Sequence, residues 1–155
     1  MLLTPKEMAD EVIIPTLTPL KLNNKPSVVP LLLGTCAVES NFGKYNRQIL
    51  GPALSVFQIE PFTFYDIKNR RNSYFMKAGY NTIKLKAEDM LDDLKLSCLV
   101  CRLKYLDTPK PLPNSPDDVE ALARYWKQFY NTRLGKGSIE DFIEKYNRYI
   151  LGEKK

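Results

Sequence analysis

The sequence of 155 residues contains no histidine. Imidazole is the usual base beside a nucleophilic Ser or Cys, a common metal ligand and the side chain that titrates near neutral pH. Its absence excludes Ser-His and Cys-His nucleophile systems, His-ligated metals and imidazole proton shuttles. An enzyme made from this chain must therefore take its acid or base from a carboxyl group, Lys, Tyr or Cys.

Cysteine is scarce, and the three residues Cys36, Cys98 and Cys101 cannot all pair with one another. Cys98 and Cys101 have the two-residue spacing of half a zinc site, but a second half is missing. The same spacing places both on one stripe of a helix, and a free Cys packs as a small hydrophobe. We therefore predict buried thiols, with no metal site and no cofactor.

Long apolar runs are also missing. No stretch of about 18 apolar residues is present, so we expect no membrane insertion. The first residues lack the basic start and apolar run of a signal peptide. We therefore expect synthesis in a cytoplasm, which suits reduced thiols.

What remains is an ordinary globular composition, with 44% apolar and 26% charged residues. The length fits a single domain over residues 1–155. Lys and Arg number 23 against 18 Asp and Glu, which gives a net charge of +5. A positive surplus favours polyanions such as nucleic acid, anionic membranes or bacterial wall polymers, although this value is also normal for a soluble domain. Nucleic acid is disfavoured as a partner because the basic residues are scattered among acids without a recognised motif.

The pattern along the chain is helical, with strong start and stop signals. Capping residues predict helix starts after Thr4, Ser27, Ser115 and Ser138. The first helix should end before Pro15, and Pro61 should open another through about Ile67. We expect an irregular segment over 70–79 and the longest helix from Thr82 or Lys84 to about Leu106. The fold predicted is mainly α, with one short extended piece over residues 51–59.

Glu39 is the first candidate for chemistry, because it follows the apolar run Cys36-Ala37-Val38 near the end of a buried helix. Desolvation there would raise its pKa and keep it protonated as a proton donor. An exposed Glu at a helix end is the alternative.

Two later segments carry groups suited to a sugar ligand. Small residues between Gly51 and Ser55 allow a ligand to approach the backbone, and the Gln58 amide can both donate to and accept from hydroxyl and N-acetyl groups. Tyr130 and Asn131 place a hydroxyl and an amide side by side at a helix end. An edge strand and an ordinary aromatic core are the respective alternatives.

In this order, the three segments resemble the lysozyme-like lytic transglycosylases, whose pattern is Glu-Ser, then Gly-Leu-Met-Gln near a Pro, then Ala-Tyr-Asn-Ala-Gly. The matching stretches are Glu39-Ser40, Val56-Phe57-Gln58 with Pro61, and Tyr130-Asn131. Ser55 stands in place of the first Gly, Phe129 and Thr132 replace the alanines, and the last glycines are displaced to 135 and 137. The resemblance covers about residues 27–147.

The resemblance implies a single lysozyme-like domain, α-rich with a very small extended element, with a substrate cleft for peptidoglycan glycan strands. It implies that Glu39 is the general acid and base for the β-1,4 bond between N-acetylmuramic acid and N-acetylglucosamine. The residues that would bind substrate are Ser40, Ser55, Gln58, Tyr130 and Asn131. Lytic transglycosylation, with an anhydro-muropeptide product, is the leading mechanism, and lysozyme-type hydrolysis is the alternative.

The short chain resembles phage-encoded members of this family. That implies synthesis in a host cytoplasm and then association with the virion or release to the cell wall, for entry or for host lysis. Other phage virion proteins are further candidate partners. A catalytically inactive structural virion or wall-binding protein with this fold is the alternative from a different class.

A second carboxylate is required by the two-carboxylate glycosidases. Glu60 is the candidate, because the residue before Pro61 is biased toward extended backbone, where Gln58 and Glu60 would share a face. The alternative is a solvated Glu beside a helix start, so the single-acid mechanism leads.

Overall fold

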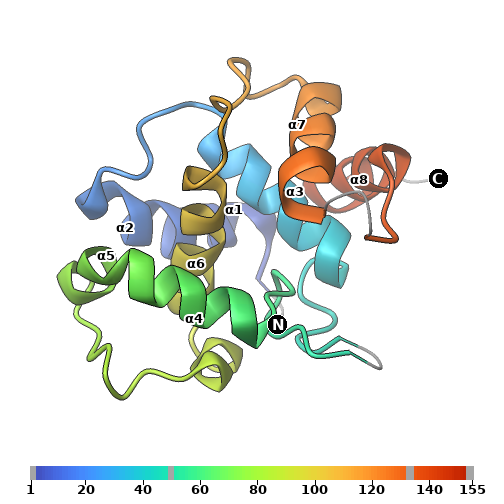
Figure 1. The fold of residues 1–155 in the computed structure, drawn as a ribbon. Helices are drawn as coiled ribbons and strands as arrows, with labels where there is room; N and C mark the ends of the chain where they lie inside the picture. The colour runs from blue at the N-terminus through green and yellow to red at the C-terminus, as the bar shows by residue number, and fades with distance from the viewer. Residues whose placement is uncertain (1–2, 49–50, 132–134, 153–155) are drawn as a thin grey trace.

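The computed structural model describes residues 3–48, 51–131 and 135–152. It is mainly helical, as predicted, and these residues form no strand (Figure 1). The expected extended piece is a tight loop held by two isolated bridges, which pair Leu54 with Arg47 and with Ile59. In the described part of the chain, no helix is long and apolar enough to cross a membrane.

The N-terminal helix continues past the stop that we predicted. It comprises α1 (Pro5–Glu7), a π-helical turn η1 (Met8–Ile13), α2 (Ile14–Leu17) and the 3-10 turn η2 (Thr18–Leu20). The predicted capping box at Thr4 is present. The predicted end before Pro15 is wrong, because the Ile14 N–H donates to Ala9 O, five residues back. This wider turn accommodates a proline that would break a regular α-helix.

The next helix, α3 (Val28–Ser40), is buried along most of its length. Ser27 lies at its N-cap position as predicted, but its buried hydroxyl makes no capping hydrogen bond. At the other end, Asn41 adopts the left-handed conformation, with φ +51°, and stops the helix. This termination leaves Glu39 in the last turn.

The central part of the chain contains two differences from prediction. After α4 (Pro61–Arg70), the segment expected to be irregular forms α5 (Asn72–Lys77). The longest predicted helix is divided into the 3-10 turn η3 (Ala87–Leu91) and α6 (Leu94–Leu106). The Asp93 carboxylate accepts a 2.9 Å hydrogen bond from the Leu96 N–H and so starts α6 about ten residues later than expected.

The C-terminal part comprises α7 (Val119–Trp126), the π-helical turn η4 (Lys127–Asn131), α8 (Ile139–Lys145) and a last π-helical turn η5 (Tyr146–Ile150). Asp118, and not Ser115, caps α7 through a 3.0 Å bond from the Ala121 N–H. The capping box predicted at Ser138 and Asp141 is present.

Helix α6 lies between the two sides of the molecule. In Figure 1, α4 and α5 lie on one side of it, and α7 and α8 lie on the other side, next to α3. Both α3 and α4 pack against α6, and α3 also packs against α7 and α8. The three cysteines are buried and free, as predicted. Among the residues described, no cluster of Cys, Asp or Glu could hold a metal ion.

Candidate active site

Glu39 lies in the last turn of α3 as a partly buried carboxyl group. Its Oε2 accepts a 2.9 Å hydrogen bond from the indole N–H of Trp126, which lies at the end of α7. Burial raises the Glu39 pKa to about 7, while the Trp126 bond and the positive charge of Lys104 oppose that rise. Desolvation is the larger effect, so a substantial fraction of Glu39 carries its proton at neutral pH.

Lys104, in the last turn of α6, places a positive charge near Glu39. Its ammonium donates a 3.1 Å hydrogen bond to Tyr130 O and lies 3.8 Å from the centre of the Tyr130 ring. Desolvation lowers the Lys104 pKa, whereas the negative charges of Glu39 and Glu60 raise it. Lys104 is therefore electrostatically coupled to both carboxylates.

Glu39 lines a cavity of about 870 Å³, a volume typical of ligand-binding sites. Its walls come from the end of α3, the start of α4, the last turn of α6, the end of α7 with η4, and α8. The loop residues Tyr45, Arg47, Gln48 and Ala53 also line it. Of the residues expected at the site, the cavity is lined by Glu39, Gln58, Glu60, Tyr130 and Asn131.

Tyr130 connects two walls of this cavity. Its ring is buried and stacks on Tyr105, and its hydroxyl donates a 2.6 Å hydrogen bond to Phe57 O. The carbonyl belongs to the loop that carries Gln58. The structure thus assigns Tyr130 the role of an anchor between η4 and this loop.

The loop itself has two residues in the left-handed region. Ser55 has φ +71° and Gln58 has φ +52°. The Gln58 amide Nε2 donates a 2.8 Å bond to Ser55 O, and the Ser55 hydroxyl accepts a 3.2 Å bond from the Phe57 N–H. These bonds close the loop on itself and place Gln58 in the cavity wall.

Two of the expected binding residues are placed elsewhere. Ser40 and Ser55 are each 1% exposed and are absent from the cavity wall. The Ser40 hydroxyl donates to Cys36 O at 2.9 Å and accepts from the Gly43 N–H at 2.8 Å. In this structure both hydroxyls hydrogen-bond to the backbone and neither faces the cavity.

Asn131 lies at the end of η4, where the Lys127 side chain forms several hydrogen bonds. The Lys127 ammonium donates to Asn131 Oδ1 at 2.8 Å, to Gly135 O at 3.1 Å and to Gly137 O at 2.6 Å. A Cβ at Gly137 would lie 2.6 Å from the Trp126 ring. Only glycine at position 137 therefore lets this segment lie so close to Trp126, the residue that hydrogen-bonds to Glu39. Thr132 lies outside the described residues.

The candidate second carboxylate, Glu60, is exposed at the N-cap of α4 and lines the cavity. Asp141 on α8 is a further carboxylate in the wall, and it was not among the residues predicted from the sequence. Its Oδ2 accepts a 2.9 Å bond from the Ser138 N–H, as part of the capping box. Among the described residues that line the cavity, the carboxyl groups are therefore those of Glu39, Glu60 and Asp141.

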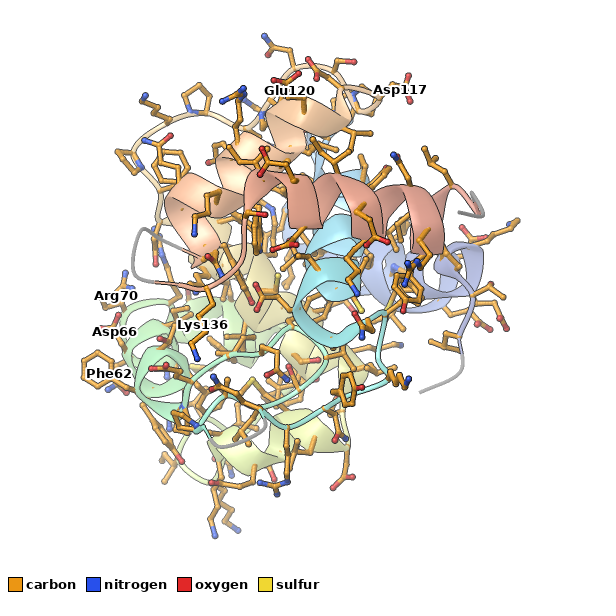
Figure 2. The ribbon with its side chains drawn as sticks, turned by 90° about the vertical axis from the view of Figure 1, so that its right-hand side faces the viewer. Phe62, Asp66, Arg70, Asp117, Glu120 and Lys136 are labelled. Carbon is orange, nitrogen blue, oxygen red and sulfur yellow. The ribbon has the colours of Figure 1, made fainter. Side chains whose placement is uncertain are left out.

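Trp126 and several basic residues are the other features that the sequence analysis missed. A tryptophan in an apolar helix has an indole N–H that needs an acceptor when buried, and this was the available signal for Trp126. Basic residues in the cavity wall are Arg47, Lys104, Lys136 and Lys145. Figure 2 shows Lys136 pointing from the segment before α8 toward the side where α4 carries Phe62.

In comparisons with protein-family models, with curated proteins and with solved structures, no match to this chain was found. The assignment of a function therefore depends on the site and on the order of the three sequence segments.

Proposed function

We propose that this protein cleaves the β-1,4 bond between N-acetylmuramic acid and N-acetylglucosamine in bacterial peptidoglycan, with Glu39 as general acid and base, in a lysozyme-like domain. The observation that carries the proposal is the position of Glu39: a partly buried carboxyl group with a pKa of about 7 in the wall of a cavity large enough for sugar rings. A general acid works best when its pKa lies near the working pH.

The loop from Ser55 to Gln58 provides separate support. Ser55 occupies the place of a Gly in the transglycosylase pattern, and its φ of +71° is a conformation that favours glycine. The sequence pattern and the backbone conformation thus agree at this position. Gln58 follows in the cavity wall, where its amide oxygen can accept a hydrogen bond from a sugar hydroxyl or acetamido N–H.

The reaction begins when protonated Glu39 transfers its proton to the bridging oxygen between the two sugars, and the glycosidic bond breaks. The acetamido group of the substrate stabilises the cationic carbon. Trp126 holds the Glu39 carboxylate that results, because the indole N–H is a donor and favours the ionised form. Lys104 contributes a nearby positive charge with the same effect.

Glu39 then accepts a proton from the nucleophile. In lytic transglycosylation the nucleophile is the primary hydroxyl of the muramic acid itself, which yields an anhydro-sugar. In lysozyme-type hydrolysis it is water. We favour the first mechanism, because Glu60 and Asp141 are exposed at the cavity edge and resemble solvated carboxylates more than a second catalytic group.

The decisive experiment measures the turbidity of a purified cell-wall suspension with the wild type, Glu39→Gln and Glu60→Gln. We expect clearing by the wild type and Glu60→Gln, and a loss of about 10²–10⁴-fold with Glu39→Gln. Both substitutions remove one carboxyl group from the same cavity, so Glu60→Gln is the matched control. Equal clearing by Glu39→Gln and the wild type would remove Glu39 from the mechanism.

Mass spectrometry of the released muropeptides separates the two mechanisms. Anhydro-muropeptides are expected from transglycosylation, and reducing ends alone would indicate hydrolysis. Wall binding without any soluble product would instead favour the non-catalytic alternative, a structural virion or wall-binding protein. For the biological setting we propose phage entry or host lysis.

A further inference from the structure

Arg102 is a buried cation on α6, outside the candidate active site. Its side chain is 5% exposed, and its Nε donates a 2.8 Å hydrogen bond to Leu22 O. Within residues 3–48, 51–131 and 135–152, no carboxylate forms an ion pair with it. By contrast, the more exposed Arg70, Arg71 and Arg124 each pair with an Asp or Glu.

The surroundings of Arg102 do not neutralise it. Burial lowers the pKa of Arg102, and the groups that act on it electrostatically, Tyr125, Cys101 and Tyr74, include no carboxylate. A buried guanidinium without an anion is unfavourable, and proteins normally pair such a charge or satisfy its hydrogen bonds. A bound anion would offset the cost of burying this charge.

Arg102 lines a second cavity, of about 290 Å³, between α6 and the connection that follows it, which contains Pro109 and Pro111. Two lysines, Lys25 and Lys110, and the amide residue Asn24 also line this cavity. Among the described residues that line it, none is Asp or Glu. Tyr125 closes one side, where its hydroxyl donates a 2.8 Å bond to Lys110 O.

We propose that this second cavity binds a phosphate group, held by the Arg102 guanidinium and the ammonium groups of Lys25 and Lys110. Arginine suits this role because its planar fork donates two parallel hydrogen bonds to a phosphate or carboxylate. The Nε–H is occupied by Leu22 O, which fixes the orientation of the fork. Three cations match the charge of a phosphate better than the single charge of a carboxylate.

The size of the cavity limits the ligand. A volume of 290 Å³ lies at the lower end of the range for ligand sites and suits a phosphate group with a small substituent. The phosphate can be a terminal monoester or a bridging diester, since both present oxygens to the same three cations. Inorganic phosphate and dimethyl phosphate serve as probes of these two forms.

The test is a titration of the full-length protein with each probe at constant ionic strength, adjusted with chloride. Binding is followed by calorimetry and by the NMR resonance of the Arg102 Nε–H, which we expect to shift with inorganic phosphate. Arg102→Lys keeps the charge but loses the fork, so affinity should fall about tenfold or more. Acetate should bind more weakly than phosphate.

The lysine variants keep the proposal testable even if Arg102→Lys does not fold. Lys25 and Lys110 are exposed, so their replacement by Ala leaves the core intact. We expect the double variant to lose phosphate binding, while Lys95→Ala, an exposed lysine on the same helix as Arg102, binds like the wild type.

Tighter binding of inorganic phosphate would assign a terminal phosphate, and tighter binding of dimethyl phosphate would assign a diester; either supports the site. Two results would overturn it: neither probe binding more strongly than chloride, or the lysine double variant binding as well as the wild type. Glu39→Gln should bind phosphate normally, so the failure of the proposed function would leave this result unaffected.

Discussion

The indole N–H of Trp126 donates a 2.9 Å hydrogen bond to Oε2 of Glu39, across 87 positions of sequence. This bond favours the ionised carboxylate, whereas burial favours the protonated acid, and burial is the larger effect. Because the resulting pKa of about 7 lies near neutral pH, Glu39 can exist in both protonation states during one reaction. That property is what a residue acting first as acid and then as base requires.

Removal of this bond by Trp126→Phe should raise the Glu39 pKa further, because the carboxylate loses a donor while the aromatic packing is largely kept. We expect the apparent pKa to move upward by about one pH unit. Carbon-13 NMR of the Glu39 carboxyl group measures the change directly. The alkaline limb of wall clearing should move in the same direction, since the acid stays protonated to higher pH.

Tyr125→Phe is the control for this substitution, because Tyr125 is a buried aromatic residue on the same helix that does not line the cavity of Glu39. Its replacement should leave the Glu39 titration unchanged. An unchanged Glu39 pKa in Trp126→Phe would mean that the indole bond has no influence on the acid.

The pH dependence of stability should also report on Glu39. Its pKa rises from 4.5 to about 7 on folding, so the folded state holds the proton more tightly. The resulting stabilisation is fully present below pH 4.5 and is lost as the pH rises toward 7. Relative to Glu39→Gln, the wild type should lose about 3 kcal/mol of unfolding free energy over this range. Denaturant unfolding of both proteins at pH 4, 5.5 and 8 measures the difference, and parallel curves would contradict it.

Tyr130→Phe should loosen the loop that carries Gln58, because the Phe57 carbonyl loses the hydroxyl that donates to it. We expect a loss of about 1–3 kcal/mol in stability, since a buried acceptor is left unsatisfied. Hydrogen exchange should accelerate in residues 54–59. The exposed Tyr45 lines the same cavity, and Tyr45→Phe should change stability by less than about 0.5 kcal/mol. Equal protection of the loop in both variants would show that Tyr130 is not its anchor.

Gly34→Ala should separate α3 from α8. A Cβ at this position would lie 2.2 Å from Cζ of Phe142, so the rings and helices must shift. Overpacking of this kind costs about 1–3 kcal/mol, more than the helix propensity gained by Ala, which is about 1 kcal/mol. Thermal or denaturant unfolding measures the loss, and Phe142→Leu should recover part of it in the double variant. A fully additive double variant would contradict the contact.

The elements that could be predicted from the sequence are those defined by local chemistry. The capping boxes at Thr4 and Ser138 depend on residues three positions apart, and both are present. The helix α5 was missed because the polar run from Arg70 to Asn72 favoured an irregular segment, whereas in the structure Arg71 pairs with the distant Asp107 and Phe75 is buried in the core. Tertiary contacts of this kind leave no periodic signal in the sequence.

The same distinction applies to the site. The raised pKa of Glu39 was predicted from its apolar neighbours in α3. Its hydrogen bond to Trp126 and its coupling to Lys104 depend on how α3, α6 and α7 pack together, which the sequence pattern does not encode. Ser40 and Ser55 were expected to bind substrate because of their place in the motif. Both side chains are buried, and their hydroxyls form hydrogen bonds with backbone groups.

The positive φ of Ser55 has a consequence for how this loop can vary. The chain already follows a path that glycine adopts without cost, so Ser and Gly can replace one another here with the turn unchanged. What the exchange alters is a single hydroxyl and its bond to the Phe57 N–H. Related chains can thus diverge at this position while Gln58 keeps its orientation.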